Sequence, residues 1–233
     1  MTRLYDPSLP LSLHNRPPFF VNREAGLVRF SPQLRKVAIV AGGPSKRDAP
    51  LTDPSWEIWG LNVVPVLDAT GALRADRWWE MHPLEAQNAQ DLAWLARCPL
   101  PVYMPSLSPE VPNAVRYPLE AVPGPRYYAC SFAYQLALAL HEGFRVVGLY
   151  GVDLPLGSFR ERTVEWACVA WWIGFLEGRG VEVVIPDSSP LGKHPGLYGY
   201  QYTLEKDEVE RYEQEFFEEA MRGLRVKGIV DGA

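Results

Sequence analysis

The stretch VAIVAGGPSK, residues 37–46, decides the fold that we expect of this chain. Its apolar first half runs directly into Gly42, Gly43, Pro44 and Ser45. A short, continuous apolar run that ends in glycines is typical of a strand buried on both faces of a parallel sheet. Because glycine has no side chain, the backbone after such a strand can approach a ligand closely. The stretch therefore predicts a buried strand and a turn, and it leaves open whether the turn holds a phosphate.

The rest of the chain alternates between segments of strand and helix character. The segments from residue 131 onward are the clearest, because a helix, a strand, a helix and a strand follow one another with short connections. Such alternation indicates an α/β domain with a mainly parallel sheet flanked by helices. Strands are predicted at 56–62, 76–82, 100–105, 145–154 and 181–189, and helices at 85–98, 131–144 and 161–180.

Composition changes at both ends of this domain. Residues 1–35 are rich in Pro and Arg and show no sustained period, so they predict an irregular N-terminal arm. Residues 36–193 form the predicted ligand-binding domain, and 194–233 a loop and an amphipathic C-terminal helix. That helix has two open uses, docking on its own chain or on another subunit of a homo-oligomer. Its apolar face would consist of Val209, Tyr212, Phe216, Ala220 and Leu224.

Charge and cysteine content exclude several classes of protein. The net charge of −5 argues against a nonspecific nucleic-acid binder, which needs a basic surface. Cys98, Cys130 and Cys168 are an odd number at wide spacings, as expected of reduced thiols rather than a disulfide framework. No histidines and carboxylates have the spacing of metal ligands, so we predict no structural zinc.

The ends and hydrophobic segments of the chain indicate a soluble protein. Prolines interrupt the first twenty residues, which lack the apolar core of a signal peptide. No segment approaches the roughly 18 apolar residues that a membrane-spanning helix needs. We therefore expect a cytoplasmic protein.

Polar groups follow most of the predicted strands at their carboxyl ends. In open parallel sheets, ligands bind beyond these ends, near the point where the strand order reverses. The backbone N–H groups of the glycine turn, together with the Ser45 hydroxyl, are suited to cradle a phosphate or to contact a ribose. The chain has neither G-x-G-x-x-G nor G-x-x-x-x-G-K-[ST], so a plain turn stays open as well. The candidate ligand-binding residues are Gly42, Gly43, Pro44, Ser45, Asn62, His82, Ser131, Asp153, Ser188 and Ser189.

Three of these candidates have a defined alternative. His82 is a candidate general base, because imidazole titrates near neutrality, and the alternative is packing against the neighbouring tryptophans. Ser131 begins the helix at 131–144, so it either caps that helix or contacts a ligand. Asp153 ends the most hydrophobic strand, where its carboxylate faces a pocket or caps the next segment.

Charged residues near the ends of the later strands are the other candidates. Glu161 and Glu165 lie one helical turn apart beside Arg160. We interpret them either as substrate contacts or as solvated charges at the start of a helix. Lys193 and His194 follow the last strand, where they would reach a phosphate or lie in an exposed loop.

Four of these segments, taken together, resemble a known family. They look like the core of the bacterial sialyltransferases that use CMP-sialic acid. Pyrophosphokinase-like proteins of pterin metabolism share the G-P-S loop and the G-x-D strand end, and uncharacterised phage-encoded proteins also look similar. The resemblance spans 36–193 and implies a Rossmann-like fold with a nucleotide site. The segments are AIVAGGPSK (38–46), WGLN (59–62), CSFAYQLALALHEGFRVVGLYGVDL (130–154) and VIPDSSPLGK (184–193).

The resemblance assigns roles to individual residues, and the chain departs from the family at two positions. The family's loop usually has Asn where this chain has Gly43. The family also places a catalytic histidine in a segment where this chain has none, between Asp153 and Pro186. By the resemblance, Ser131 would contact the cytidine or its phosphate, Ser188 would close the site, and the nucleotide pocket would be lined by Gly42, Gly43, Pro44, Ser45 and Asn62.

The resulting hypothesis is a nucleotide-binding transferase that moves a glycosyl-type group from a CMP-sugar-like donor to an unknown acceptor, with no tightly bound cofactor. Arg160 or Lys193 would neutralise the leaving phosphate, and Glu165 or His82 would be the base. One alternative is a pyrophosphokinase-like enzyme that uses Mg²⁺ and ATP, with Asp153 on the metal side. The other is a noncatalytic binding or assembly protein with a degenerate nucleotide site.

Overall fold

The computed structural model describes residues 20–29, 36–62, 74–122, 127–193, 197, 199–200, 214 and 218. The chain divides into two compact units, Met1–Gly192 and Lys193–Ala233. Within the described ranges, no helix combines the length and the apolar character that a membrane span requires. The apolar face predicted for the C-terminal helix and His194 lie outside these ranges.

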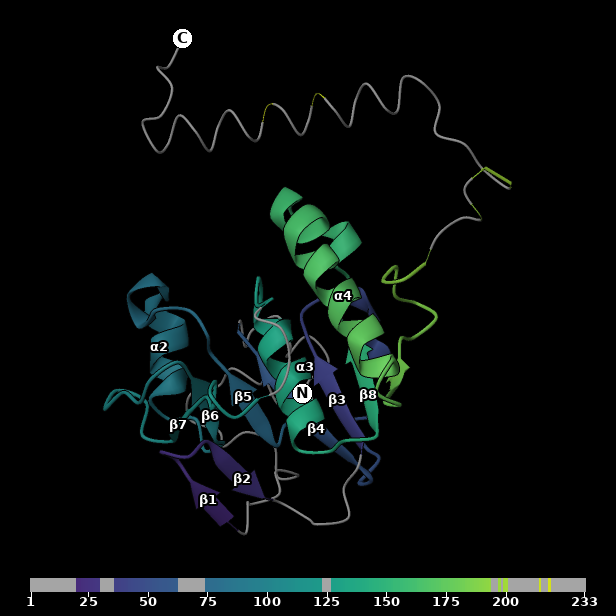
Figure 1. Ribbon diagram of the computed structural model, residues 1–233. Helices are drawn as coiled ribbons and strands as arrows, with labels where there is room; N and C mark the ends of the chain where they lie inside the picture. The colour runs from purple at the N-terminus through teal and green to yellow at the C-terminus, as the bar shows by residue number, and fades with distance from the viewer. Residues whose placement is uncertain are drawn as a thin grey trace. The chain divides into compact units, whose positions relative to one another are not determined.

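A parallel sheet forms the centre of the first unit (Figure 1). Its seven strands among the described residues follow the order β7-β6-β5-β4-β3-β8-β9, and every neighbouring pair is parallel. This arrangement confirms the predicted α/β, Rossmann-like class. The strands are β3 (Lys36–Val40), β4 (Trp56–Leu61), β5 (Arg77–Trp79), β6 (Val102–Met104), β7 (Ala114–Arg116), β8 (Val146–Tyr150) and β9 (Glu182–Val184).

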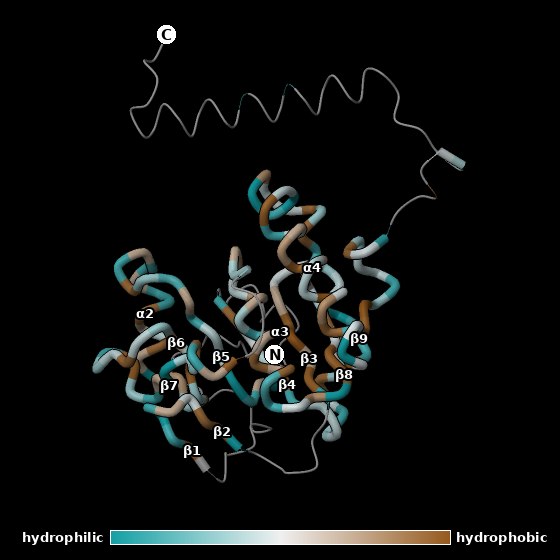
Figure 2. The backbone as a smooth tube through the Cα atoms, in the orientation of Figure 1, coloured by the Kyte–Doolittle hydropathy of each residue, from teal (hydrophilic) through white to brown (hydrophobic). Residues whose placement is uncertain are grey.

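Helices cover both faces of this sheet. Val37 and Ile39 of β3 belong to a core that includes α3 and α4, whereas Ala38 and Val40 point to the opposite core, which includes α2. Because both faces are buried, β3 and β8 are apolar along most of their length rather than at every second position, as the tube in Figure 2 shows. The helices are α2 (Ala89–Leu95), α3 (Ser131–His141) and α4 (Trp166–Glu177).

Several short elements differ from the sequence predictions. Helix α2 is shorter than the predicted 85–98, because the side chain of Asn88 caps it by accepting hydrogen bonds from two backbone N–H groups. Strand β7 was not predicted. The N-terminal segment that reads as irregular holds an antiparallel hairpin of β1 (Phe20–Asn22) and β2 (Leu27–Arg29). The residues around β1, β2 and β7 do not form the apolar runs that revealed other three-residue strands, so the sequence pattern did not indicate them.

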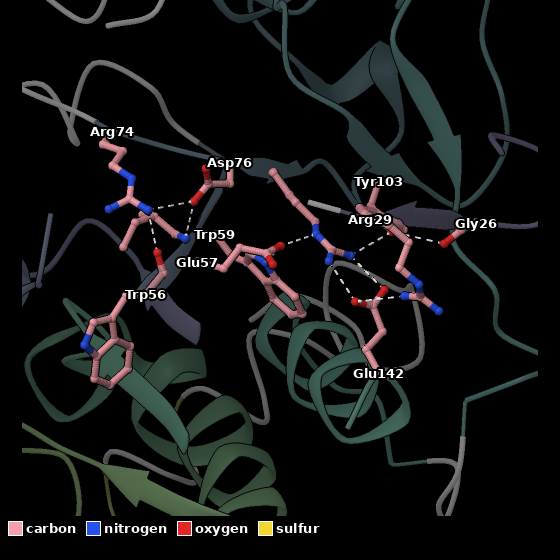
Figure 3. A network of polar contacts seen from close by, with 11 residues as sticks. Gly26, Arg29, Trp56, Glu57, Trp59, Arg74, Asp76, Tyr103 and Glu142 are labelled. Carbon is pink, nitrogen blue, oxygen red and sulfur yellow. Dashed lines mark hydrogen bonds and ion pairs between the residues drawn. The ribbon is translucent and has the colours of Figure 1, made fainter. Parts of the chain in front are cut away.

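A buried ionic network joins the hairpin, the sheet and α3 (Figure 3). The guanidinium of Arg77 donates two hydrogen bonds of 2.7 Å to the carboxylate of Glu142, and its Nε donates to Glu57. Arg29 in β2 adds an ion pair of 3.5 Å to Glu142, and the hydroxyl of Tyr103 donates to the carbonyl oxygen of Gly26. Arg77 and Glu57 lie near the amino ends of β5 and β4, so the network leaves the carboxyl ends of the sheet free for a site.

Candidate functional site

The strand order reverses between β3 and β8. The chain leaves β3 toward β4 on one side and leaves β8 toward β9 on the other, so a crevice opens beyond the carboxyl ends of the two central strands. A cavity of about 320 Å³ lies there, which we call the loop cavity. Its walls include the glycine turn after β3, Gly151 and Asp153 after β8, and Asn62 after β4. The structure thus brings the predicted glycine turn, Asn62 and Asp153 together.

Hydrogen bonds lock the glycine turn to the end of β8. Ser45 is 1% exposed, and its Oγ donates to Asp153 Oδ1 at 2.7 Å while accepting from the Gly151 N–H at 2.8 Å. The Ser45 N–H donates to Asp153 Oδ2 at 2.8 Å, and the hydroxyl of Ser189 donates to Oδ1 at 2.6 Å. Asp153 therefore supports the loop with both of its oxygens.

The same hydrogen bonds correct the predicted phosphate cradle. The N–H of Gly43 donates to the carbonyl oxygen of Gly151 at 2.9 Å, and the N–H and Oγ of Ser45 are used by Asp153. These donors consequently do not point into the loop cavity. Gly43 serves a different purpose, because a Cβ atom there would lie 2.6 Å from Asp153 Oδ2 and 2.7 Å from Gly151 O. Its lack of a side chain lets the two loops approach each other.

Asn62 has an unpaired polar atom at the cavity wall. Its φ of 53° lies in the left-handed region, which Asn tolerates better than most residues. Its side-chain oxygen is buried and has no hydrogen-bond partner among the described residues. A buried amide oxygen without a partner is costly, so it is a natural acceptor for a donor group of a ligand.

A second cavity of about 450 Å³, which we call the histidine cavity, shares Asn62, Phe132, Glu161 and Glu165 with the loop cavity. It is also lined by His82 and Ser131. Because the two cavities have four residues in common, they form one continuous cleft.

His82 is held by a carboxylate that the sequence reasoning missed. Its Nδ1 lies 2.8 Å from Oε1 of Glu80, which is buried, while the imidazole itself is 51% exposed. A carboxylate at Nδ1 favours a proton on that nitrogen and leaves Nε2 as the basic atom. The signal was present in the sequence, since Glu80 and His82 are two residues apart in an extended segment and so lie on one face.

The amino end of α3 borders the histidine cavity. Helix α3 begins at Ser131 and its N-cap is Cys130, so the predicted N-cap at Ser131 is wrong by one residue. The cause is a boundary shift of the size that helix ends commonly show. No side chain caps this helix, and the N–H of Ala133 donates to the carbonyl oxygen of Cys130 at 3.2 Å. The N–H groups of Ser131 and Phe132, which precede Ala133, are the ones available to an anion.

A π-helical turn, η5 (Glu161–Glu165), precedes α4 and places both glutamates at the cleft. Glu161 and Ser158 form a capping box, in which the Ser158 N–H donates to the Glu161 carboxylate at 2.7 Å and the Glu161 N–H donates to Ser158 Oγ. Glu165 instead accepts from Nε of Arg160 at 3.1 Å. Burial raises the pKa of Glu165, and the nearby Arg160 opposes that rise.

Charge divides the cleft into two parts. The loop cavity is lined by Asp153, Glu161 and Glu165 and, in the part of the chain that the structure describes, by no lysine or arginine. Glu161 and Glu165 line the histidine cavity as well, but this cavity adds Arg160 and the partial positive charge of the α3 amino end. The positive groups of the cleft therefore lie on the side of the histidine cavity, where an anionic group would meet them.

Two residues that were predicted to belong to the site, Ser188 and Lys193, line neither cavity. Ser188 is exposed, lines neither cavity and donates its hydroxyl hydrogen to Asp48, whereas the adjacent Ser189 is buried against Asp153. Lys193 begins the second compact unit, and its role in the site stays a prediction. Within the described ranges, no three His, Cys, Asp or Glu side chains are grouped so that they could hold a metal ion.

Comparisons with known proteins give similarities of fold only. No protein-family model and no curated protein matches the chain significantly. The chain is similar to a solved alpha-2,3-sialyltransferase from Campylobacter jejuni in apo form, with 12% identity, a TM-score of 0.45 and coverage of 84% of this chain and 98% of that one. It is also similar to the sialyltransferase CstII of the same organism, solved with the substrate analogue cytidine-5'-monophosphate, with 11% identity, a TM-score of 0.41 and coverage of 77% and 99%.

Proposed function

We propose that the cleft binds a nucleotide-activated donor and that the protein transfers the donor's glycosyl-type group to an acceptor hydroxyl. The observation that carries this proposal is the His82–Glu80 pair, which lies in the same cavity as Arg160 and the uncapped end of α3. A base oriented by a buried carboxylate, next to donors for an anionic leaving group, is the equipment that such a transfer requires.

The nucleoside of the donor would occupy the loop cavity. Gly42 and Gly43 have no side chains there that would obstruct a flat base or a ribose, and Asn62 Oδ1 would accept a hydrogen bond from an amino or hydroxyl group. The carboxylates on this side favour a neutral group over a charged one. These features support a nucleoside without identifying its base.

The phosphate of the donor would lie in the histidine cavity. The N–H groups at the start of α3 and the guanidinium of Arg160 would stabilise the negative charge that develops on the leaving phosphate. Ser131, at the first position of that helix, would add its hydroxyl. This placement retains the predicted roles of Ser131 and Arg160 and moves the phosphate away from the glycine turn.

His82 would act as the base. Its Nε2 would accept the proton of the acceptor hydroxyl, the acceptor oxygen would bond to the transferred carbon, and the bond from that carbon to the phosphate oxygen would break. Glu165 is the second candidate, because burial raises its pKa and it lines both cavities. Arg160 already occupies one of its oxygens, so we expect His82 to carry the role.

Thermal-shift measurements test the binding half of this proposal. We would measure unfolding with CMP, CDP, UDP, GDP, ATP and NAD, each with and without Mg²⁺. A ligand at one hundred times its Kd stabilises the folded state by about 2.7 kcal/mol. We expect a metal-independent shift with CMP. A shift only with ATP and Mg²⁺ would favour the pyrophosphokinase-like alternative, and no shift with any compound would favour a noncatalytic protein.

A matched pair of variants makes this experiment specific to the cleft. Asn62→Gly removes the unpaired amide but suits the positive φ, so the protein should fold and lose its CMP shift. Gly174→Ala on α4 has no atom within 4 Å of the new Cβ and lies outside both cavities, so it should keep the shift. A shift of equal size in both variants would rule out Asn62 as a ligand contact.

A further inference from the structure

Two cysteines meet in the wall of the histidine cavity. Cys130, the N-cap of α3, lines the cavity and is partly exposed, whereas Cys168 lies in the first turn of α4 and is buried. Cys168 belongs to the core cluster against which Cys130 packs, and its Sγ lies 3.5 Å from the backbone nitrogen of Ala129, the residue before Cys130. The ends of two helices thus bring the two cysteines together beside the cleft.

Sγ of Cys168 forms hydrogen bonds with backbone groups. The N–H of Ala129 donates to it at 3.5 Å, and the Cys168 thiol donates to the carbonyl oxygen of Tyr127 at 3.5 Å. The neighbouring Cys130 lowers the pKa of Cys168 to about 7 together with backbone N–H groups, and burial opposes this change. A lowered pKa favours the thiolate, which is the form of cysteine that reacts with an oxidant.

The third cysteine has the opposite surroundings. Cys98 is buried in the core on the other face of the sheet, and its thiol faces the carbonyl oxygen of Leu100 at 3.9 Å. Burial raises the pKa of Cys98. The chain thus contains an inert thiol that serves as an internal control.

We propose that Cys130 and Cys168 are a redox-modification site, at which a hydroperoxide oxidises the pair to an intramolecular disulfide in the wall of the cleft. Cys130 opens into the histidine cavity, so a small oxidant reaches the pair from that side. The proposal does not depend on the proposed function, since the modification is read on the protein itself.

The reaction balances with one peroxide. The thiolate of the pair attacks a peroxide oxygen, the O–O bond breaks, and hydroxide leaves to give a sulfenic acid. The second sulfur then attacks the sulfenic sulfur and displaces its oxygen, which leaves as water. Two thiols and one hydrogen peroxide give one disulfide and two water molecules, with two electrons passed from the sulfur atoms to the peroxide.

The disulfide would change the cleft as well as the thiols. A disulfide bond is about 2.05 Å long, much shorter than a hydrogen-bonded contact between sulfur atoms. Its formation draws Cys130 toward α4, and the adjacent Ser131 at the start of α3 moves with it. Oxidation would therefore alter the end of the cleft that offers N–H donors to an anion.

The test counts thiols in the full-length protein. The reduced chain has three cysteines, so treatment with hydrogen peroxide should lower the free thiols found after denaturation from three to one. Peptide mapping without reduction should link Cys130 to Cys168, and dithiothreitol should restore all three thiols. The rate of loss should rise as the pH increases through about 7.

Variants identify the sulfur atoms involved. Cys98→Ser should still lose two thiols, whereas Cys130→Ser and Cys168→Ser should form no intramolecular link. Mapping of the unmodified sequence stays decisive if either variant fails to fold. Three thiols that survive peroxide, a link through Cys98, or oxidation of Cys98 at the same rate as the pair would each overturn the proposal.

Discussion

The carboxylate of Glu80 collects three hydrogen-bond donors at one oxygen. The backbone N–H of His82, its ring nitrogen Nδ1 and the side-chain amide of Gln87 all lie within 3.2 Å of Oε1. Burial raises the pKa of Glu80, and the hydrogen bonds to His82 oppose that rise. Glu80 therefore orients His82, but the buried carboxylate lowers the stability of the folded protein when it is ionised.

Glu80→Gln should make stability less dependent on pH. A raised pKa means that the folded state binds the proton more tightly than the unfolded chain does, so Glu80 contributes stability in acid that is lost as the pH rises. The free energy of unfolding in urea should accordingly fall more for the wild type than for Glu80→Gln between about pH 4 and pH 7. Parallel curves for the two proteins would contradict this assignment.

The sequence indicated which residues line the cleft better than it indicated their hydrogen-bond partners. His82 and Asp153 were predicted at strand ends, and both line the cleft. The lock between Asp153 and Ser45 spans 108 residues, so no local pattern contains it. For that reason the sequence did not show that the N–H groups of Gly43 and Ser45, two donors of the expected phosphate cradle, are used by a loop far away in the sequence.

At the scale of single elements, two glycines have opposite roles. Gly60 lies in the middle of the sheet, where a Cβ would collide with the ring of Trp78 on the adjacent strand β5. Trp78 is fully buried and cannot move into solvent. Gly174 lies on the exposed side of α4 and has open space around it.

Alanine substitutions at these glycines should shift stability in opposite directions. Gly60→Ala should lower the free energy of unfolding by about 1–3 kcal/mol, because it overpacks the core. Gly174→Ala should raise it by about 0.5–1 kcal/mol, because alanine favours the helix and no contact is disturbed. Urea unfolding measures both. A stable Gly60→Ala protein would mean that β4 and β5 can separate to admit a methyl group.

Most of the elements lie within segments whose pattern indicated them. These are strands β3, β4, β5, β6, β8 and β9 and helices α2, α3 and α4. The π-helical turn before α4 escaped prediction, because an α-helix and a π-turn place the same residues in the same order and differ only by one position in hydrogen bonding. Both ends of this turn, Glu161 and Glu165, line the cleft.

At the scale of the whole molecule, Arg77 connects parts of the chain that are distant in sequence. It balances two buried carboxylates, Glu57 and Glu142, on a strand and a helix. Burial raises the pKa of Glu57, and the positive charge of Arg77 opposes that rise. Removing Arg77 would leave both carboxylates buried without their shared partner.

Arg77→Met should therefore be severely destabilised, by about 3–5 kcal/mol. The loss should shrink in acid, where Glu57, whose pKa burial raises, becomes protonated and neutral. Urea unfolding at several pH values measures both effects. Arg116→Met is the control, since its ion pair with Glu120 is largely exposed and its removal should cost less than about 1 kcal/mol. Equal losses in the two variants would show that the buried pairing contributes nothing of its own.

The lock between the turn after β3 and the end of β8 affects how fast a ligand can bind. Ser45, Gly151 and Asp153 fix the turn within the folded protein through three short hydrogen bonds that involve no ligand. The conformational entropy of this turn is thus lost during folding rather than during binding. Association at the loop cavity should then proceed in one step, with an observed rate that rises linearly with ligand concentration and does not level off at the rate of a loop closure.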